Sequence, residues 1–230
     1  MENNGSNIPV ILANGNFPSH KIPRQILKDA KYLICTDGSL NALLQYKNEY
    51  ADDPEISVIE PFAVVGDGDS LSEDLKAQYS DIYVKYAEQD FNDLTKATRF
   101  CLEKGFCEVC YLGISGKRDD HALANVSLLV WYLKTFNLKV KAYTDHGYFV
   151  PCCGDSVFNT QKGTQVSIFN FGAKRMQSTN LKWNIYPFEE LWQGSLNEAI
   201  SDTFSIKADG YYLVFINYTD TLYECPGCGT

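Results

Sequence analysis

The feature that most constrains the fold is an alternation of short, nearly continuous apolar runs with segments of helical periodicity along the first 145 residues. The apolar runs predict strands at 8–13, 31–38, 61–67, 82–86, 109–113 and 139–144, and the periodic segments predict helices at 23–30, 40–48, 72–79, 92–104 and 120–134. Strands this apolar are buried on both faces, so the pattern predicts an α/β fold, a mainly parallel sheet with flanking helices.

The pattern of apolar and polar residues changes after about residue 145. Short strands separated by turn-rich joins are expected at 147–153, 155–161, 164–171, 181–188, 203–208 and 211–218. No convincing helix separates them, so this half predicts a small antiparallel β-sandwich. We therefore expect two domains, 1–145 and 146–230.

Charge and composition exclude some classes of function. The chain has 230 residues and a formal net charge of −9, with no stretch rich in Lys or Arg. Binding to a nucleic-acid backbone needs a basic surface, so we expect no nucleic-acid partner. An acidic protein that handles phosphates would need metal ions to offset its charge.

We expect a cytoplasmic protein without a membrane anchor. The N-terminal MENNGSNIPV has neither the basic nor the apolar region of a secretory signal, and the stretch 122–133 is too short and too mixed to span a bilayer. The eight cysteines are then expected to be reduced thiols.

Two CxxC pairs, Cys107/Cys110 and Cys225/Cys228, could together form a four-thiolate zinc site. However, the first pair falls where we expect a buried strand, whose alternation points Cys107 and Cys110 to opposite faces. The second pair lies at the extreme C-terminus. We therefore favour buried thiols and a loose tail over a zinc site.

Polar, glycine-bearing segments follow the expected strands, at Asn14–Asn16, Thr36–Ser39, Gly66–Ser70, Glu88–Asp93 and Gly113–His121. In open α/β sheets, ligands bind beyond the carboxyl ends of the strands, where these segments are expected to lie together. Their glycines would let a nucleotide approach the backbone closely, at positions 15, 38, 66, 68, 113 and 116.

Each segment taken alone also fits an ordinary helix start. Asp37 with Gly38 could form a turn and an N-cap, Asp69 or Ser70 could cap the helix that follows, and Asn92 could cap the next one. The acids that follow Arg118 could simply favour the positive end of a helix dipole.

The segments taken together suggest phosphate chemistry. Asp67, Asp69 and Asp93 would supply the oxygen ligands that Mg²⁺ requires, and Lys96 and Arg118 would meet phosphate oxygens. The chain has no G-x-x-x-x-G-K-[ST] loop and no G-x-G-x-x-G helix start, so phosphate binding would depend on metal and side chains.

The order and spacing of these motifs resemble the thiamine pyrophosphokinase (thiamin diphosphokinase) family. The matching blocks are TDGSLNAL, VVGDGDSLS, QDFNDLTKA, GISGKRDDHALANVSLL, KGTQVSIFNF and LKWNIYPFEELWQGSLNEAIS. The chain departs from the family pattern at Ser39, Gly68, Asn92, Lys117 and the segment 195–197, and none of these departures removes a charged catalytic position.

The resemblance implies a nucleotide- and metal-binding catalytic domain followed by a β-sandwich that binds thiamine and forms a homodimer. It implies transfer of the pyrophosphoryl group of ATP to the hydroxyethyl group of thiamine, which leaves AMP, with the thiamine site at the dimer interface.

We assign roles to the matching residues as follows. Asp67, Asp69 and Asp93 are expected to bind Mg²⁺, and Asp69 or Asp37 to accept the alcohol proton. Further expected ligand contacts come from Asn14, Gly15, Gln89, Lys96, Gly116, Arg118, Asp120, His121, Trp183, Ser195 and Asn197. Arg118 would clamp a phosphate, with Asp120 orienting it or binding ligand. Trp183 would stack on the thiazolium or the pyrimidine, and otherwise it is a core or interface residue.

Two other functions fit parts of the pattern. A phosphohydrolase of the haloacid-dehalogenase type also uses Asp-x-Asp after a strand, but there the pair follows the first strand and here it follows the third. A non-catalytic sensor of thiamine phosphates or nucleotide is the other, and the intact acidic set with Arg118 argues against it.

Overall fold

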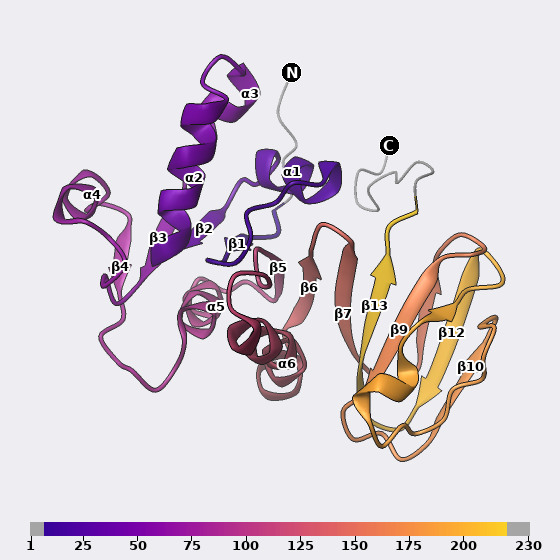
Figure 1. Ribbon diagram of the computed structural model, residues 1–230. Coiled ribbons are helices and arrows are strands. Elements are labelled where there is room, and N and C mark those ends of the chain that lie inside the picture. Colours follow the sequence, from indigo (N-terminus) through magenta and orange to yellow (C-terminus); the bar gives the residue numbers. More distant parts are fainter. Residues whose placement is uncertain (1–6, 220–230) are drawn as a thin grey trace. The chain divides into compact units, whose positions relative to one another are not determined.

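The structure is a computed structural model that describes residues 7–219 of the chain (Figure 1). The chain divides into two compact units. Of the described residues, the first unit contains 7–128 together with Ala142–Asp145, and the second contains Leu129–Lys141 together with 146–219. Among the described residues, no helix combines the length and the apolar character needed to cross a membrane.

The first unit is built on parallel strands, as the sequence predicts. These are β1 (Val10–Leu12), β2 (Leu33–Thr36), β3 (Ala63–Gly66), β4 (Tyr83–Lys85) and β5 (Glu108–Leu112). Their order in the sheet is β5-β1-β2-β3-β4, and the four pairings are all parallel. Strand β6 (Lys139–Tyr143) contributes residues to both units. Strands β2, β3 and β4 thus follow one after another on one side of β1, and β5 pairs with its other side.

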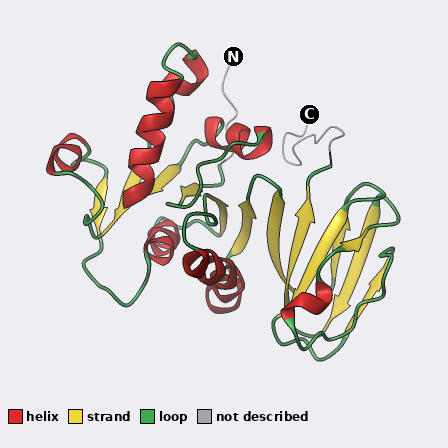
Figure 2. Ribbon diagram, in the orientation of Figure 1, coloured by secondary structure: helices red, strands yellow, loops and turns green. Residues whose placement is uncertain are grey.

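Helices cover both faces of these strands (Figures 1 and 2). They are α1 (Lys21–Lys28), α2 (Asp37–Glu49), α3 (Pro54–Ser57), α4 (Glu73–Gln78), α5 (Asp93–Glu103) and α6 (Asp119–Phe136). Leu40 and Leu43 of α2 pack on the face that carries Leu12 and Cys35. Helix α5 contacts β1, β2 and β3, and its Thr98 hydroxyl lies 2.8 Å from that of Tyr111, which points to the opposite face.

The helix starts agree with the expected caps in part. The Asn92 side chain caps α5 by accepting the backbone N–H of Thr95, as predicted. The cap of α4 is Ser72, so the prediction of Asp69 or Ser70 was wrong. Asp37 is the first residue of α2 and not its N-cap, which leaves its carboxylate available for other contacts.

The second unit consists of antiparallel strands in two sheets, which confirms the predicted sandwich. The elements are β7 (Gly147–Cys153), β8 (Ser156–Asn159), β9 (Gln165–Asn170), β10 (Met176–Thr179), the 3₁₀ turn η1 (Leu191–Gly194), β11 (Asn197–Glu198), β12 (Thr203–Ala208) and β13 (Tyr211–Asn217). One sheet has the order β11-β9-β13-β7, and the other has the order β10-β12-β8.

The strand expected at 181–188 is wrong. Only Leu181 makes a β-bridge, to Ala199, and the rest of the segment is irregular. Its buried residues are Leu181, Ile185 and Phe188, a spacing of three to four that no strand can place on one face. The short strands β10 and β11 and the helix α3 were not predicted.

The cysteines of the described residues are free thiols. Cys107 precedes β5 and is exposed, whereas Cys110 lies within β5 and is buried. Cys225 and Cys228 lie outside the described residues.

Candidate active site

The five polar segments all follow strands at the carboxyl edge of the parallel sheet. The loops after β1 and β5 are bonded to each other, because the Gly15 N–H donates to the Gly113 carbonyl (2.7 Å) and the Asn16 N–H to the Ser115 carbonyl (2.8 Å). A Cβ on Gly15 would lie 2.3 Å from each of the Gly113 and Ser115 carbonyl oxygens, so only glycine fits there. This junction is the point where the strand order reverses, the usual ligand crevice of such sheets.

Asp37 lies completely buried at the end of β2. Its Oδ2 accepts the backbone N–H of Gly68, while its Oδ1 has no hydrogen-bond partner among the described residues. A Cβ on Gly66 would lie 2.2 Å from the Asp37 carboxyl carbon, so the glycine lets the carboxylate pack against the backbone of β3. The loop after β3 is thereby attached to the start of α2.

A buried lysine lies between two further acids. The Lys96 ammonium is 3.4 Å from Oδ2 of Asp67 and 3.5 Å from Oδ1 of Asp93, and its side chain is only 2% exposed. The Gln89 amide donates to the same Asp67 oxygen (3.3 Å). The structure therefore brings together four of the predicted site residues, from the loop after β3, the β4–α5 loop and the first turn of α5.

The pKa values of the site acids are shifted in different directions by their surroundings. Burial raises the pKa of Asp37, and the negative charges of Asp93 and Asp67 raise it further, against the opposing hydrogen bond from Gly68. Burial also raises the pKa of Asp93, whereas the backbone N–H of Asp69 lowers the pKa of Asp67, with help from Gln89 and Lys96. Carboxylates that affect one another in this way form one electrostatic unit.

Asp69 occupies a more open position than the other three acids. Its backbone N–H donates to Oδ1 of Asp67 (3.1 Å), which fixes the turn after β3, and its side chain is exposed. Its charge contributes to the raised pKa of Asp93, so it belongs to the same electrostatic unit.

The site acids offer the oxygen ligands that Mg²⁺ prefers, but their side chains do not by themselves surround a metal ion. Within residues 7–219, no group of three or more His, Cys, Asp or Glu side chains converges closely enough to hold a metal ion. The donor atoms here are carboxylate oxygens, and the Asp37 Oδ1 is an unsatisfied buried acceptor. Mg²⁺ is commonly held by one or two carboxylates, substrate phosphates and water, and this arrangement fits such shared coordination.

The loop between β5 and α6 carries two cations with different partners. Arg118 makes two hydrogen bonds to Asp120, at 3.1 and 2.5 Å, and lowers the pKa of that carboxyl. The Lys117 ammonium donates to Oδ1 of Asn14 (2.7 Å). His121 follows in the first turn of α6 and is exposed. Gly116 packs on Asn16, since a Cβ there would lie 2.2 Å from the asparagine side chain.

Two residues at this edge were missed from the sequence. The Ser39 hydroxyl, at a departure from the family pattern, donates to the Leu12 carbonyl (2.6 Å) and links β1 to α2. The Tyr83 hydroxyl is buried 2.5 Å from where a Cβ of Gly68 would lie, and burial raises the pKa of Tyr83 to about 12. Tyr83 belongs to no motif, and Ser39 lies in TDGSLNAL only as a departure from the family pattern, so neither was expected to contribute to this edge.

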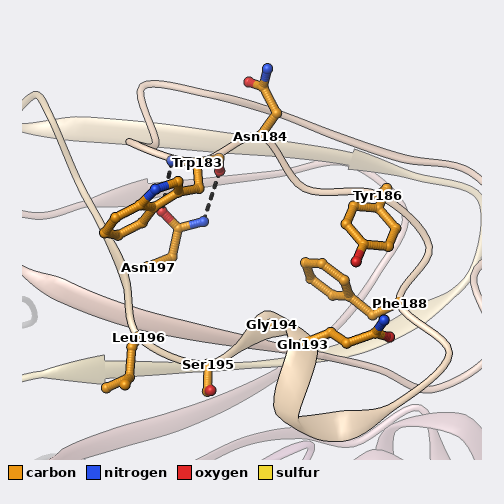
Figure 3. A pocket seen from close by; sticks show the side chains of 9 residues that line it. All are labelled: Trp183, Asn184, Tyr186, Phe188, Gln193, Gly194, Ser195, Leu196 and Asn197. Carbon is orange, nitrogen blue, oxygen red and sulfur yellow. Dashed lines mark hydrogen bonds between the residues drawn. The ribbon is translucent and has the colours of Figure 1, made fainter.

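The second unit has a pocket of about 400 Å³ that contains the three remaining predicted residues (Figure 3). It is lined by Trp183, Asn184, Tyr186, Phe188, Gln193, Gly194, Ser195, Leu196 and Asn197. The buried Asn197 side chain accepts a hydrogen bond from the backbone N–H of Trp183 (3.2 Å) and donates one to the backbone carbonyl of the same residue (2.8 Å). Trp183 itself is 53% exposed, so it is not a core residue. The aromatic Tyr186 and Phe188 were not predicted as lining residues.

Two family models match the chain. Residues 23–142 match the model described as thiamin pyrophosphokinase, catalytic domain, and residues 147–215 match the model described as thiamin pyrophosphokinase, substrate-binding domain. The first match alone covers more than half of the chain and contains the site acids Asp37, Asp67 and Asp93. The second match contains the residues that line the pocket.

Individual relatives agree with the family models. Thiamin pyrophosphokinase 1 of Caenorhabditis elegans is 30% identical over 111 residues, which cover 45% of this chain and 42% of the nematode protein. Thiamine pyrophosphokinase 2 of Oryza sativa subsp. japonica is 24% identical over 204 residues, or 76% of this chain and 72% of that protein. The match to the nematode protein thus spans less than half of its length.

Solved structures share the fold. Yeast thiamin pyrophosphokinase has a TM-score of 0.74 at 16% identity, over 91% of this chain and 86% of its own. The Bacillus subtilis thiamine pyrophosphokinase has a TM-score of 0.71 at 21% identity, over 93% of this chain and 99% of its own. At these identities the likeness establishes the fold, an α/β unit followed by an antiparallel one.

Proposed function

The chain belongs to the thiamin pyrophosphokinase family, and from that premise we propose that it transfers the pyrophosphoryl group of ATP to the hydroxyethyl group of thiamine, giving thiamine diphosphate and AMP. The observation that carries this proposal is the group formed by Asp37, Asp67, Asp93 and Lys96 at the carboxyl edge of the sheet. It lies in the segment that matches the catalytic-domain model.

The reaction joins the alcohol oxygen of thiamine to the β-phosphorus of ATP and breaks the bond from that phosphorus to the oxygen that leaves with AMP. The protein supplies little covalent chemistry for such a transfer, so catalysis depends on positioning and charge neutralisation. When bound, Mg²⁺ would neutralise phosphate charge and align the two phosphates. Asp67, Asp69 and Asp93 would hold it, with substrate oxygens completing the coordination.

The remaining residues of the first unit would orient ATP. Lys96 holds Asp67 and Asp93 at fixed positions and adds a buried positive charge beside them. Gln89 donates to Asp67 in this structure and would turn its amide to a phosphate oxygen. Arg118 presents a planar guanidinium already oriented by Asp120, which suits bidentate contact with phosphate.

The alcohol proton needs an acceptor, and Asp37 and Asp69 are the two candidates. Asp37 has an unsatisfied buried oxygen and a raised pKa, whereas Asp69 is exposed. The acceptor must come within hydrogen-bond distance of the alcohol, so the activities of Asp37→Asn and Asp69→Asn decide between the two carboxylates.

The pocket of the second unit is the proposed thiamine subsite. Its half-exposed Trp183 offers a π face to a cationic ring, and Asn197 fixes the backbone that carries this indole. A homodimer and a cytoplasmic location also stay proposals for this chain. Exposed apolar side chains near the pocket, including Trp192 and Leu196, suit a surface that another copy covers.

The direct test is AMP production from ATP and Mg²⁺, with and without thiamine, for the wild type and for Asp67→Asn. Thiamine-dependent AMP that the substitution abolishes would support the proposal. Phosphate released without thiamine would indicate the phosphohydrolase instead. Thiamine binding without turnover would indicate a sensor.

A further inference from the structure

Lys117 has an unusual backbone conformation for a lysine. Its φ is +55°, in the left-handed region that favours glycine and asparagine. The other described non-glycine residues with positive φ are Asn137, Asn180 and Leu196, two of which are of the tolerant type. A conformational cost held in a ligand-binding loop is a reason to look for a function of the side chain.

The neighbours of Lys117 explain how this conformation is held. Gly116 before it packs on the Asn16 side chain and also has a positive φ, of +80°. On its other side, Arg118 leads into α6. The loop is thus fixed from both sides, and it directs the Lys117 ammonium to Asn14 at the end of β1.

Lys117 differs from the other cations of the site in the charge of its partner. Lys96 lies between the carboxylates of Asp67 and Asp93, and Arg118 is paired with Asp120. Lys117 donates instead to the uncharged amide of Asn14, and no carboxylate of the described residues lies within ion-pair distance of it. Its charge is therefore not neutralised before a ligand binds.

The hydrogen bond to Asn14 places the Lys117 ammonium at the junction of β1 and β5, where the strand order reverses. Its side chain packs on Gly38 at the start of α2, where a Cβ would lie 2.0 Å from the Asn14 amide nitrogen. The ammonium thus lies beside the loops after β1 and β5, where ligands of open α/β sheets bind. A hydrogen bond from an exposed ammonium to a neutral amide is readily exchanged for one to an anionic oxygen, because charged acceptors bind more strongly.

We propose that Lys117 is a further substrate-binding residue, which leaves Asn14 and binds a phosphate oxygen of ATP. This inference rests on the proposed function. It adds Lys117 to the ATP-binding residues already assigned, which are the site acids, Gln89, Lys96 and Arg118. Because the contact is a point charge near the surface, it contributes to ATP binding more than to the chemical step, and salt weakens it.

The test compares Lys117→Met, Lys117→Arg and Lys117→Gly with the wild type in steady-state assays of AMP formation. Lys117→Met should raise the KM for ATP about tenfold, with kcat and the KM for thiamine nearly unchanged. Lys117→Arg keeps the charge and should restore most of the affinity. Lys117→Gly suits the positive φ, so it should lose ATP affinity while its thermal midpoint stays the same or rises.

Lys31→Met is the matched control. Lys31 is also an exposed lysine that donates to an asparagine, with Nζ 3.3 Å from Oδ1 of Asn7, but it precedes β2 at the opposite edge of the sheet. The substitution Lys31→Met removes the same charge as Lys117→Met but changes no residue of the proposed site. An equal rise in KM for Lys31→Met and Lys117→Met would overturn the inference, since it would reflect net charge alone.

Binding of the non-cleavable analogue α,β-methylene-ATP, measured by calorimetry, separates this inference from the proposed function. If the wild type binds the analogue but makes no thiamine-dependent AMP, the proposed function fails, and the affinities of the Lys117 variants still decide this inference. An unchanged affinity for the analogue in Lys117→Met would overturn it.

Discussion

The backbone N–H of Gly68 donates a hydrogen bond to the buried carboxylate of Asp37, 31 positions earlier in the chain. This contact attaches the acidic loop after β3 to the first turn of α2. It makes the position of Asp67 and Asp69 depend on a residue from another motif, so a change at Asp37 should affect both stability and catalysis.

Replacing Asp37 tests this dependence. Asp37→Ala leaves the Gly68 N–H without its acceptor in a buried site, which should lower the free energy of unfolding by about 1–3 kcal/mol. Asp37→Asn keeps an acceptor oxygen and should be less destabilising, yet both variants should lose most activity. Denaturant unfolding and AMP formation measure the two effects, and equal stability of both variants would contradict the role of this hydrogen bond.

The raised pKa of Asp37 predicts a pH dependence of stability. The folded chain binds this proton more tightly than the unfolded chain, so stability falls as the pH rises from about 4 through the folded-state pKa. Asp37→Asn removes this contribution. The stability of the variant relative to the wild type should therefore improve from pH 4 toward neutral pH in metal-free buffer, and a difference that does not change with pH would refute the prediction.

Lys96 should matter for both charge balance and catalysis. Lys96→Met fills the buried space but removes the cation between Asp67 and Asp93, which are both partly solvated. We expect a loss of about 1–2 kcal/mol of stability in metal-free buffer, after allowance for solvent screening. Activity should fall by about 100-fold or more. Added Mg²⁺ should recover part of the stability, as measured by thermal unfolding, because it replaces the missing charge.

Gly15 should not tolerate even a methyl group. Gly15→Ala places a Cβ 2.3 Å from the Gly113 and Ser115 carbonyl oxygens, so the loops after β1 and β5 must separate. We expect a loss of about 1–3 kcal/mol of stability together with weaker ATP binding. Gly105→Ala is the control, since its Cβ meets nothing within 4 Å and only its φ of +84° opposes alanine. The control should cost about 1 kcal/mol and leave the KM for ATP unchanged.

Asn197 should control the thiamine subsite through Trp183. Asn197→Ala removes the partner of both backbone polar groups of Trp183, which should raise the KM for thiamine and shift the tryptophan fluorescence. Gln177→Ala is the control, because Gln177 is an exposed amide residue of β10 in the same unit and is not among the residues that line the pocket. Equal effects of the two substitutions would contradict the positioning role of Asn197.

The local elements were predictable because they depend on short-range patterns. Apolar runs of five to eight residues in the first unit and the Asn92 cap are properties of neighbouring residues, and both agree with the structure. The segment 181–188 failed because its apolar residues are buried by the surrounding sandwich without a ladder partner beyond Leu181. Burial there is decided by contacts that are distant in sequence.

The sequence by itself determined the parallel α/β unit, the antiparallel unit and the edge at which the polar segments gather, because periodicity and strand direction fix these features. Only the tertiary structure decided that Asp37 is buried with an unsatisfied oxygen and that Lys96 lies between Asp67 and Asp93. It likewise decided that Lys117 faces a neutral amide. Burial and the charge of a partner depend on how separate segments pack, and no local pattern encodes them.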